Sequence, residues 1–229
     1  MSSKVHLIEC YFEEWENTLL RAKELTNSEK FHLEGITVLL CHIAAMGRAR
    51  YPNCKDWESF KNIVRYYSGK YDLFENIDLL FLYQFQHSKV SDDKNYQSLL
   101  NNQEVVGILE KAIGAEEKIT ISDSLRYQKR DDLLQIIKGA SIPGFDESNF
   151  VRYIELFSNN QILYEYARCE AVHNNDFPLI NIGITFPDMQ RTFTPNHQIT
   201  SAVMVETLEG IISNLKKECL AEEKWPIQL

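Results

Sequence analysis

Long stretches of this sequence contain neither glycine nor proline, and their apolar residues recur at helical spacing. The chain of 229 residues has only 9 glycines and 6 prolines, so few positions force a helix to stop. A hydrophobic content of 44% supplies enough apolar side chains for a real core. The sequence therefore predicts an all-α protein folded as an antiparallel helical bundle.

The expected helices share one apolar face each and are bounded by capping or breaking residues. They lie at residues 6–25, 31–51, 57–67, 72–86, 94–100, 103–113, 123–138, 150–157, 158–178 and 198–222. Thr26 with Glu29, Asp56, and Ser148 or Asn149 are interpreted as caps. The helix at 31–51 is apolar on nearly every side, so we expect it near the centre of the bundle, with Gly47 allowing a neighbour to approach closely.

Two segments depart from this pattern. Residues 88–149 are more polar and have shorter apolar stripes, which predicts a helical insertion within a single domain spanning 1–229. Beyond Pro178, residues 180–186 alternate between apolar and polar, and 190–194 can return, which predicts a short β-hairpin before the last helix.

Charge and cysteine usage limit the class of protein. The net charge of −9 argues against broad nucleic-acid binding, so any RNA contact requires a local basic patch. The five cysteines form no CxxC pair and are typical of reduced thiols in a cytoplasmic protein. The longest apolar run, residues 36–46, is too short to span a bilayer, so we expect no membrane association.

Cofactor signatures are missing from the sequence, and basic residues are few. The six histidines are scattered and no glycine-rich phosphate loop occurs, so neither a metal nor a cofactor is expected. Arg48 and Arg50 end the second helix, and Arg126, Lys129 and Arg130 form the densest basic cluster. These five are candidates for positioning RNA. Alternatively they interact with a helix C-terminus, with acidic neighbours, or with solvent.

One segment, residues 158–178 (SNNQILYEYARCEAVHNNDFP), carries two unusual polar residues near the end of a well-marked helix. Ser158 and Gln161 fit a capping box at its start, and Pro178 prevents its continuation. Arg168 and His173 lie five residues apart, which corresponds to about 140° around a regular α-helix. The two side chains would therefore flank an edge of the helix.

This pair suits cleavage of RNA by its own 2′-hydroxyl, which needs an acid–base group and a cation on the phosphate. His173 lies in the last turn, where the helix dipole and Glu170 favour imidazolium, and Arg168 offers a forked donor that Tyr164 can stack on. The reaction needs one group to remove a proton and another to donate one, and each chain offers a single histidine here. A symmetric homodimer would supply two histidines. The alternative is that Arg168 pairs with Glu165 or a buried carboxylate while His173 caps helix carbonyls.

The segment LYEYARCEAVHNND resembles the motif of the HEPN superfamily, in which an arginine is followed after four to six residues by a histidine at a helix end. The layout of residues 5–87 and 150–221 is similar too, with an apolar helix running into GRARYP and an amphipathic final helix. HEPN proteins are helical bundles that dimerise through the motif helices, and many are metal-independent ribonucleases of toxin–antitoxin or antiviral defence systems.

By this resemblance Arg168 would position the phosphate and His173 would act as acid or base. Supporting roles would fall to Tyr164, Cys169, Glu170 and Asn174. Active members often carry Asn, Asp or His where this chain has Cys169, and one toxin subfamily carries a modified Tyr at the position of Asn175. Two hypotheses follow: a dimeric endoribonuclease with an antitoxin or other defence partner, or a non-catalytic module that binds a nucleotide, RNA or a protein.

Overall fold

The fold was analysed in a computed structural model, which describes residues 3–86, 103–114, 118–119, 122–142, 145–173, 180–181 and 193–229. These residues are mainly helical, with two sheets of two short strands each. The predicted all-α class is therefore confirmed.

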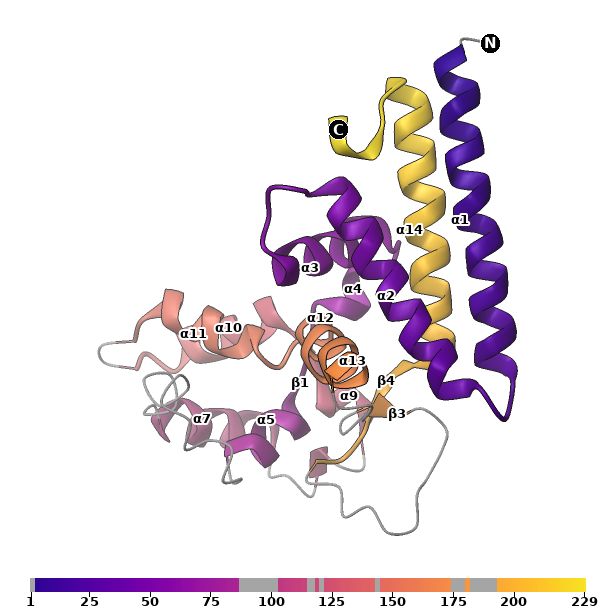
Figure 1. The fold of residues 1–229 in the computed structure, drawn as a ribbon. Helices are drawn as coiled ribbons and strands as arrows, with labels where there is room; N and C mark the ends of the chain where they lie inside the picture. The colour runs from indigo at the N-terminus through magenta and orange to yellow at the C-terminus, as the bar shows by residue number, and fades with distance from the viewer. Residues whose placement is uncertain are drawn as a thin grey trace.

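Four helices form the bundle that contains both ends of the chain (Figure 1). They are α1 (Ser3–Asn27), α2 (His32–Arg50), α3 (Asp56–Tyr67) and α14 (Ser201–Glu222). Helices α1 and α14 lie side by side and antiparallel, α2 crosses them, and α3 packs against both α2 and α14. A short 3₁₀ turn, Pro226–Gln228, follows α14 and contacts α2.

Two glycines let helix backbones approach closely at these crossings. A Cβ at Gly47 of α2 would lie 2.7 Å from the carbonyl oxygen of Ser59 in α3, as the sequence led us to expect. A Cβ at Gly210 of α14 would lie 2.1 Å from the carbonyl oxygen of Ser68, just beyond α3. Any larger residue at either position must push the helices apart.

A second group of helices packs away from α1 and α14 (Figure 1). It comprises α5 (Leu79–Gln86), α7 (Gln103–Ile113), α10 (Arg130–Gly139) and α11 (Glu147–Glu155). The bounds of α7 agree with the sequence prediction. Buried apolar residues of both groups belong to one core, among them Phe12, Ile36, Leu80, Leu109, Leu133, Ile154 and Leu208. None of the helices in the described ranges combines the length and the apolarity that a bilayer crossing requires.

Two expected helices are interrupted by strands. The elements involved are α4 (Tyr71–Phe74), β1 (Asn76–Asp78), α9 (Asp123–Arg126) and β2 (Tyr127–Lys129). Strands β1 and β2 pair antiparallel, with Ile77 opposite Gln128. The continuous helices predicted at 72–86 and 123–138 are therefore wrong. Strand pairing joins segments about fifty residues apart, so helical spacing alone could not reveal it.

Of the strand expected after the motif helix at residues 180–186, the structure describes the first two residues, and both are in a strand. Strand β3 (Ile180–Asn181) pairs with β4 (Asn196–Thr200), which leads directly into α14. The pairing is parallel, so these two strands are not the two arms of a hairpin. Most of the segment expected to return, 190–194, and the expected helix 94–100 lie outside the described residues.

Three caps differ from the sequence interpretation. Thr26 belongs to α1, where its hydroxyl donates to the carbonyl of Ala22 at 2.7 Å, so it does not open α2. Lys55, one residue before Asp56, occupies the N-cap position of α3. The carboxylate of Asp146 accepts from the Asn149 amide at 3.0 Å and caps α11.

Candidate site on the motif helix

The motif helix runs through α12 (Asn159–Ile162), a π-helical segment (Leu163–Cys169) and α13 (Glu170–His173). Figure 1 shows it end-on, between the two groups of helices. Its predicted start is confirmed, because the Ser158 hydroxyl accepts from the Gln161 amide at 3.1 Å. The side chain of Gln161 does not complete a capping box. It donates to Glu165 at 2.7 Å instead.

Buried amides fix the first turn of this helix to its neighbours. Asn160 donates to the carbonyl of Lys61 in α3 at 3.0 Å, and Asn159 donates to the carbonyl of Leu73 at 2.8 Å. Both asparagines are fully buried. Since a buried amide is costly to leave unpaired, these contacts fix how the motif helix is rotated about its axis.

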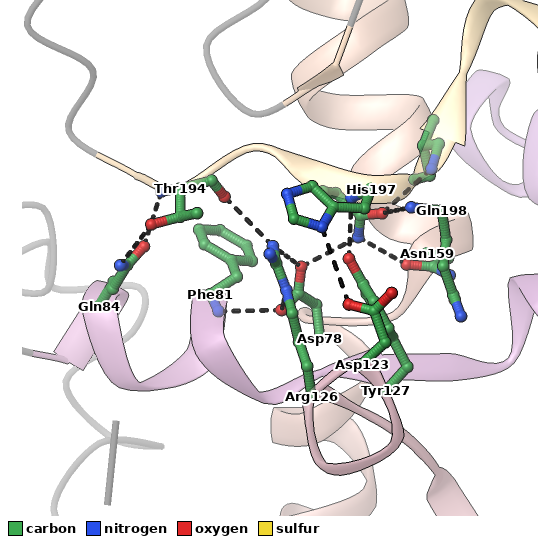
Figure 2. Close-up of polar contacts among 12 residues, drawn as sticks. Asp78, Phe81, Gln84, Asp123, Arg126, Tyr127, Asn159, Thr194, His197 and Gln198 are labelled. Carbon is green, nitrogen blue, oxygen red and sulfur yellow. Dashed lines mark hydrogen bonds and ion pairs between the residues drawn. The ribbon is translucent and has the colours of Figure 1, made fainter. Parts of the chain in front are cut away.

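The start of the motif helix also belongs to a buried ionic network (Figure 2). Arg126 makes a two-pronged ion pair with Asp78, at 2.9 and 2.7 Å, and both side chains are closed to solvent. Asn196 donates to Asp78 at 3.0 Å and to Asn159 of α12 at 2.8 Å. The network therefore ties β1, α9 and β4 to the beginning of the motif helix.

The π-helical segment changes which residues of the motif face one another. A π-helix bonds each residue to the one five positions on, so residues five apart lie on the same side. Tyr164 and Cys169 are related in this way, whereas in an α-helix they would be about 140° apart. Burial, the Cys169 thiol and the Asp56 carboxylate raise the pKa of Tyr164 well above its usual range. Tyr164 therefore stays protonated and can donate.

Arg168 is held at this edge by three groups. Its Nη2 lies 3.1 Å from an Asp56 carboxylate oxygen, its guanidinium lies 5.6 Å from the centre of the Tyr164 ring, and its Nη1 contacts the Cys169 sulfur at 3.8 Å. The Tyr164 hydroxyl donates to the same carboxylate at 3.2 Å. Arg168 keeps 21% of its side chain exposed and Asp56 keeps 45%. The result is a permanent positive charge with a fixed orientation and partial access to solvent.

The remaining motif residues are only partly described. His173 is the last residue of α13, and its side chain, like Asn174 as a whole, lies outside what the structure describes. Glu170 begins α13 and is half-buried. The structure therefore brings together Arg168, Tyr164 and Cys169.

The basic residues at the end of α2 have partners within the bundle. Arg48 donates to the carbonyl of Cys54 at 2.6 Å. Arg50 donates to the Tyr67 hydroxyl at 2.8 Å and lies 4.9 Å from the centre of the Tyr51 ring. Arg48 therefore braces the turn between α2 and α3, and Arg50 joins the C-terminal ends of these two helices.

The basic cluster at residues 126–130 is divided between the interior and the surface. Arg126 is 1% exposed and paired with Asp78, so it is out of reach of an RNA backbone, which corrects its assignment to an exposed patch. Lys129 is exposed and pairs with Asp72 at 2.9 Å. Arg130 lies 3.7 Å from both Glu75 and Glu155. Of the three, only Lys129 and Arg130 retain solvent access.

Asp56 is the site residue that sequence reasoning missed as a partner of the motif. It is the first residue of α3, 112 positions before Arg168, and a carboxylate at a helix start is ordinarily explained by the helix dipole. No signal in the sequence links the two residues. Comparison of the chain with family models, with curated proteins and with solved structures finds no match.

Proposed function

We propose that this protein is a metal-independent endoribonuclease of HEPN type, active as a homodimer in which the edges carrying Arg168 and His173 meet. The observation that carries the proposal is the fixed Arg168 guanidinium at the π-helical edge of the motif helix. Local π-helical turns are frequent at functional sites, and a preoriented guanidinium favours the negative charge that develops on a phosphate under attack.

In this proposal Asp56 and Tyr164 aim the guanidinium before RNA arrives. Arg168 has five N–H donors, and its contacts with Asp56 and Cys169 engage only some of them. A phosphate oxygen takes the others, and the attacking 2′-hydroxyl loses its proton to the imidazole of one His173. The His173 of the second subunit protonates the leaving 5′-oxygen, so the two-fold axis supplies the acid and the base. An antitoxin or defence partner would act by covering this edge.

One observation favours a second candidate function, that of a non-catalytic binding or dimerisation module. The ion pair with Asp56 already gives the Arg168 charge a partner, so the motif has a structural use without RNA. In that case the edge would bind a partner and would cleave nothing.

Incubation of the purified protein with total RNA in chelator tests the proposal. The wild type should cleave, whereas Arg168→Gln and His173→Ala should each lose at least about a hundredfold in rate. Arg21→Gln removes an exposed charge from α1, where its guanidinium contacts the Thr18 hydroxyl, and serves as the matched control. A wild type that cuts no RNA under these conditions would leave the binding module as the better account.

A further inference from the structure

A pocket of about 620 Å³ opens between α3 and the corner where α11 meets the motif helix. Residues of three helices line it, among them Trp57, Lys61, Arg65, Arg152, Glu155 and Gln161. Its volume falls in the range of pockets that hold small organic groups.

Positive charge exceeds negative charge in this pocket. Lys61, Arg65 and Arg152 line it against the carboxylates of Glu58 and Glu155. Glu155 is already shared, since Arg65 lies 2.9 Å and Lys61 3.4 Å from one of its oxygens, and Arg65 also pairs with Glu75 at 2.6 Å. On a chain of net charge −9, this local excess points to an anionic ligand.

Arg152 is the cation of this group that is open for a ligand. It is exposed on α11 and makes no hydrogen bond or ion pair with any residue in the described part of the chain. A guanidinium in this state can offer both prongs to a phosphate.

Trp57 gives the pocket a flat aromatic face. The residue is 42% exposed, which is unusual for so large an apolar side chain. Lys61, whose side chain is only 9% exposed, places its ammonium 5.5 Å from the centre of the indole ring. The amide of Asn62 lines the same pocket and can both donate and accept, whereas the Gln161 amide accepts from Lys61 at 3.1 Å and donates to Glu165. An aromatic ring beside amides and cations is the combination with which proteins hold an unpaired base.

The pocket connects to the motif edge along one helix. Gln161 precedes Arg168 by seven residues of the same continuous motif helix. Trp57 also directly follows Asp56, the partner of Arg168, so the pocket and the motif edge share the start of α3 as well.

We infer that this pocket holds one nucleotide of a single-stranded RNA substrate, with its base on Trp57 and a phosphate on Arg152. The inference rests on the proposed function, because the ligand is the strand whose neighbouring bond is cut at Arg168. The pocket would then decide which base stands at a fixed distance from the cleaved bond.

Binding is tested separately from cleavage with a fluorescent single-stranded RNA whose 2′-hydroxyls are all methylated, since such a strand cannot attack its own phosphates. Trp57→Ala should weaken its binding about tenfold, as expected for the loss of one stacked base, while Trp57→Phe should retain most of the affinity. Arg152→Gln should reduce the slope of log affinity against log salt by about 0.7, the value for one phosphate contact on a single strand. Arg21→Gln is the matched charge control and should change the slope least.

Equal affinity of the wild type, Trp57→Ala and Arg152→Gln would overturn the inference, as would an absence of binding by the wild type. The inference would also be overturned if free adenosine monophosphate displaced the strand with a dissociation constant equal to that of the strand. A mononucleotide would then be the ligand. The two proposals fail separately. If Trp57→Ala cleaves RNA with an unchanged KM, the pocket assignment falls and the ribonuclease stands. If the methylated strand binds through Trp57 and no RNA is cut, the pocket assignment stands and the ribonuclease proposal falls.

Discussion

The buried Asp78–Arg126 pair offers the sharpest test of how the fold supports the motif helix. Asp78 accepts two hydrogen bonds from Arg126, one from Asn196 and one from the Phe81 amide. Replacement of Asp78 by Asn keeps the size of the side chain but leaves the Arg126 guanidinium buried without a counter-charge. Breaking a buried pair in this way costs about 3–5 kcal/mol, a large share of the ~5–15 kcal/mol by which domains are stable.

Urea unfolding followed by circular dichroism measures this loss. With a slope of about 2–3 kcal/mol per molar urea, the midpoint of Asp78→Asn should fall by about 1–2 M. Asp72→Asn is the control: it removes a carboxylate from the exposed ion pair between Asp72 and Lys129 of β2, and it should leave the urea midpoint unchanged. The double variant Asp78→Asn/Arg126→Gln should be less destabilised than the sum of the single variants, because both charges leave together. Equal midpoints for Asp78→Asn and Asp72→Asn would refute the reasoning.

Three further predictions concern stability. Gly210→Ala should lower the melting temperature, because the new Cβ would lie 2.1 Å from the Ser68 carbonyl oxygen and overpacking costs about 1–3 kcal/mol. Gly139→Ala is the control and should leave the melting temperature no lower, because the space around Gly139 is open. Ser158→Ala should cost about 1 kcal/mol in urea unfolding through the loss of the motif-helix cap, and no loss would argue against that cap. Burial raises the pKa of Tyr153 to about 12. Between pH 10 and 12 this tyrosine is ionised only in the unfolded chain. Its contribution to stability, complete below pH 10, should therefore decline by about 1.4 kcal/mol per pH unit across this range. Tyr153→Phe should reduce the slope of unfolding free energy against pH by the equivalent of one proton.

The helices of the bundle could be predicted from sequence because each carries its apolar stripe locally. Strands β1 and β2 could not, since three residues give no alternation and their pairing depends on contacts about fifty residues apart. Arg126 shows the same limit. Its neighbours Lys129 and Arg130 make it look like part of a basic surface, and only the carboxylate of Asp78, 48 positions away, makes its burial tolerable.

The candidate site was likewise predictable in part. The spacing of Arg168 and His173 near a helix end is visible in the sequence, and so is the cap at Ser158. The π-helical register that places Cys169 beside Tyr164 is not, because the four-residue spacing of the buried Leu163, Ala167 and Ala171 fits an α-helix as well. The partner Asp56 lies on another helix, where an acidic residue at the helix start already has a local explanation.

In the proposed mechanism Arg168 and His173 direct the attack of a ribose 2′-hydroxyl on the neighbouring phosphate. The most direct measurement uses a DNA oligonucleotide with a single ribonucleotide, incubated in chelator with the wild type, Arg168→Gln and His173→Ala. The account predicts that the wild type cuts only after the ribose and leaves a 2′,3′-cyclic phosphate, while both variants slow at least about a hundredfold. Cleavage of the all-DNA strand, or equal cleavage by the wild type and the two variants, would contradict it.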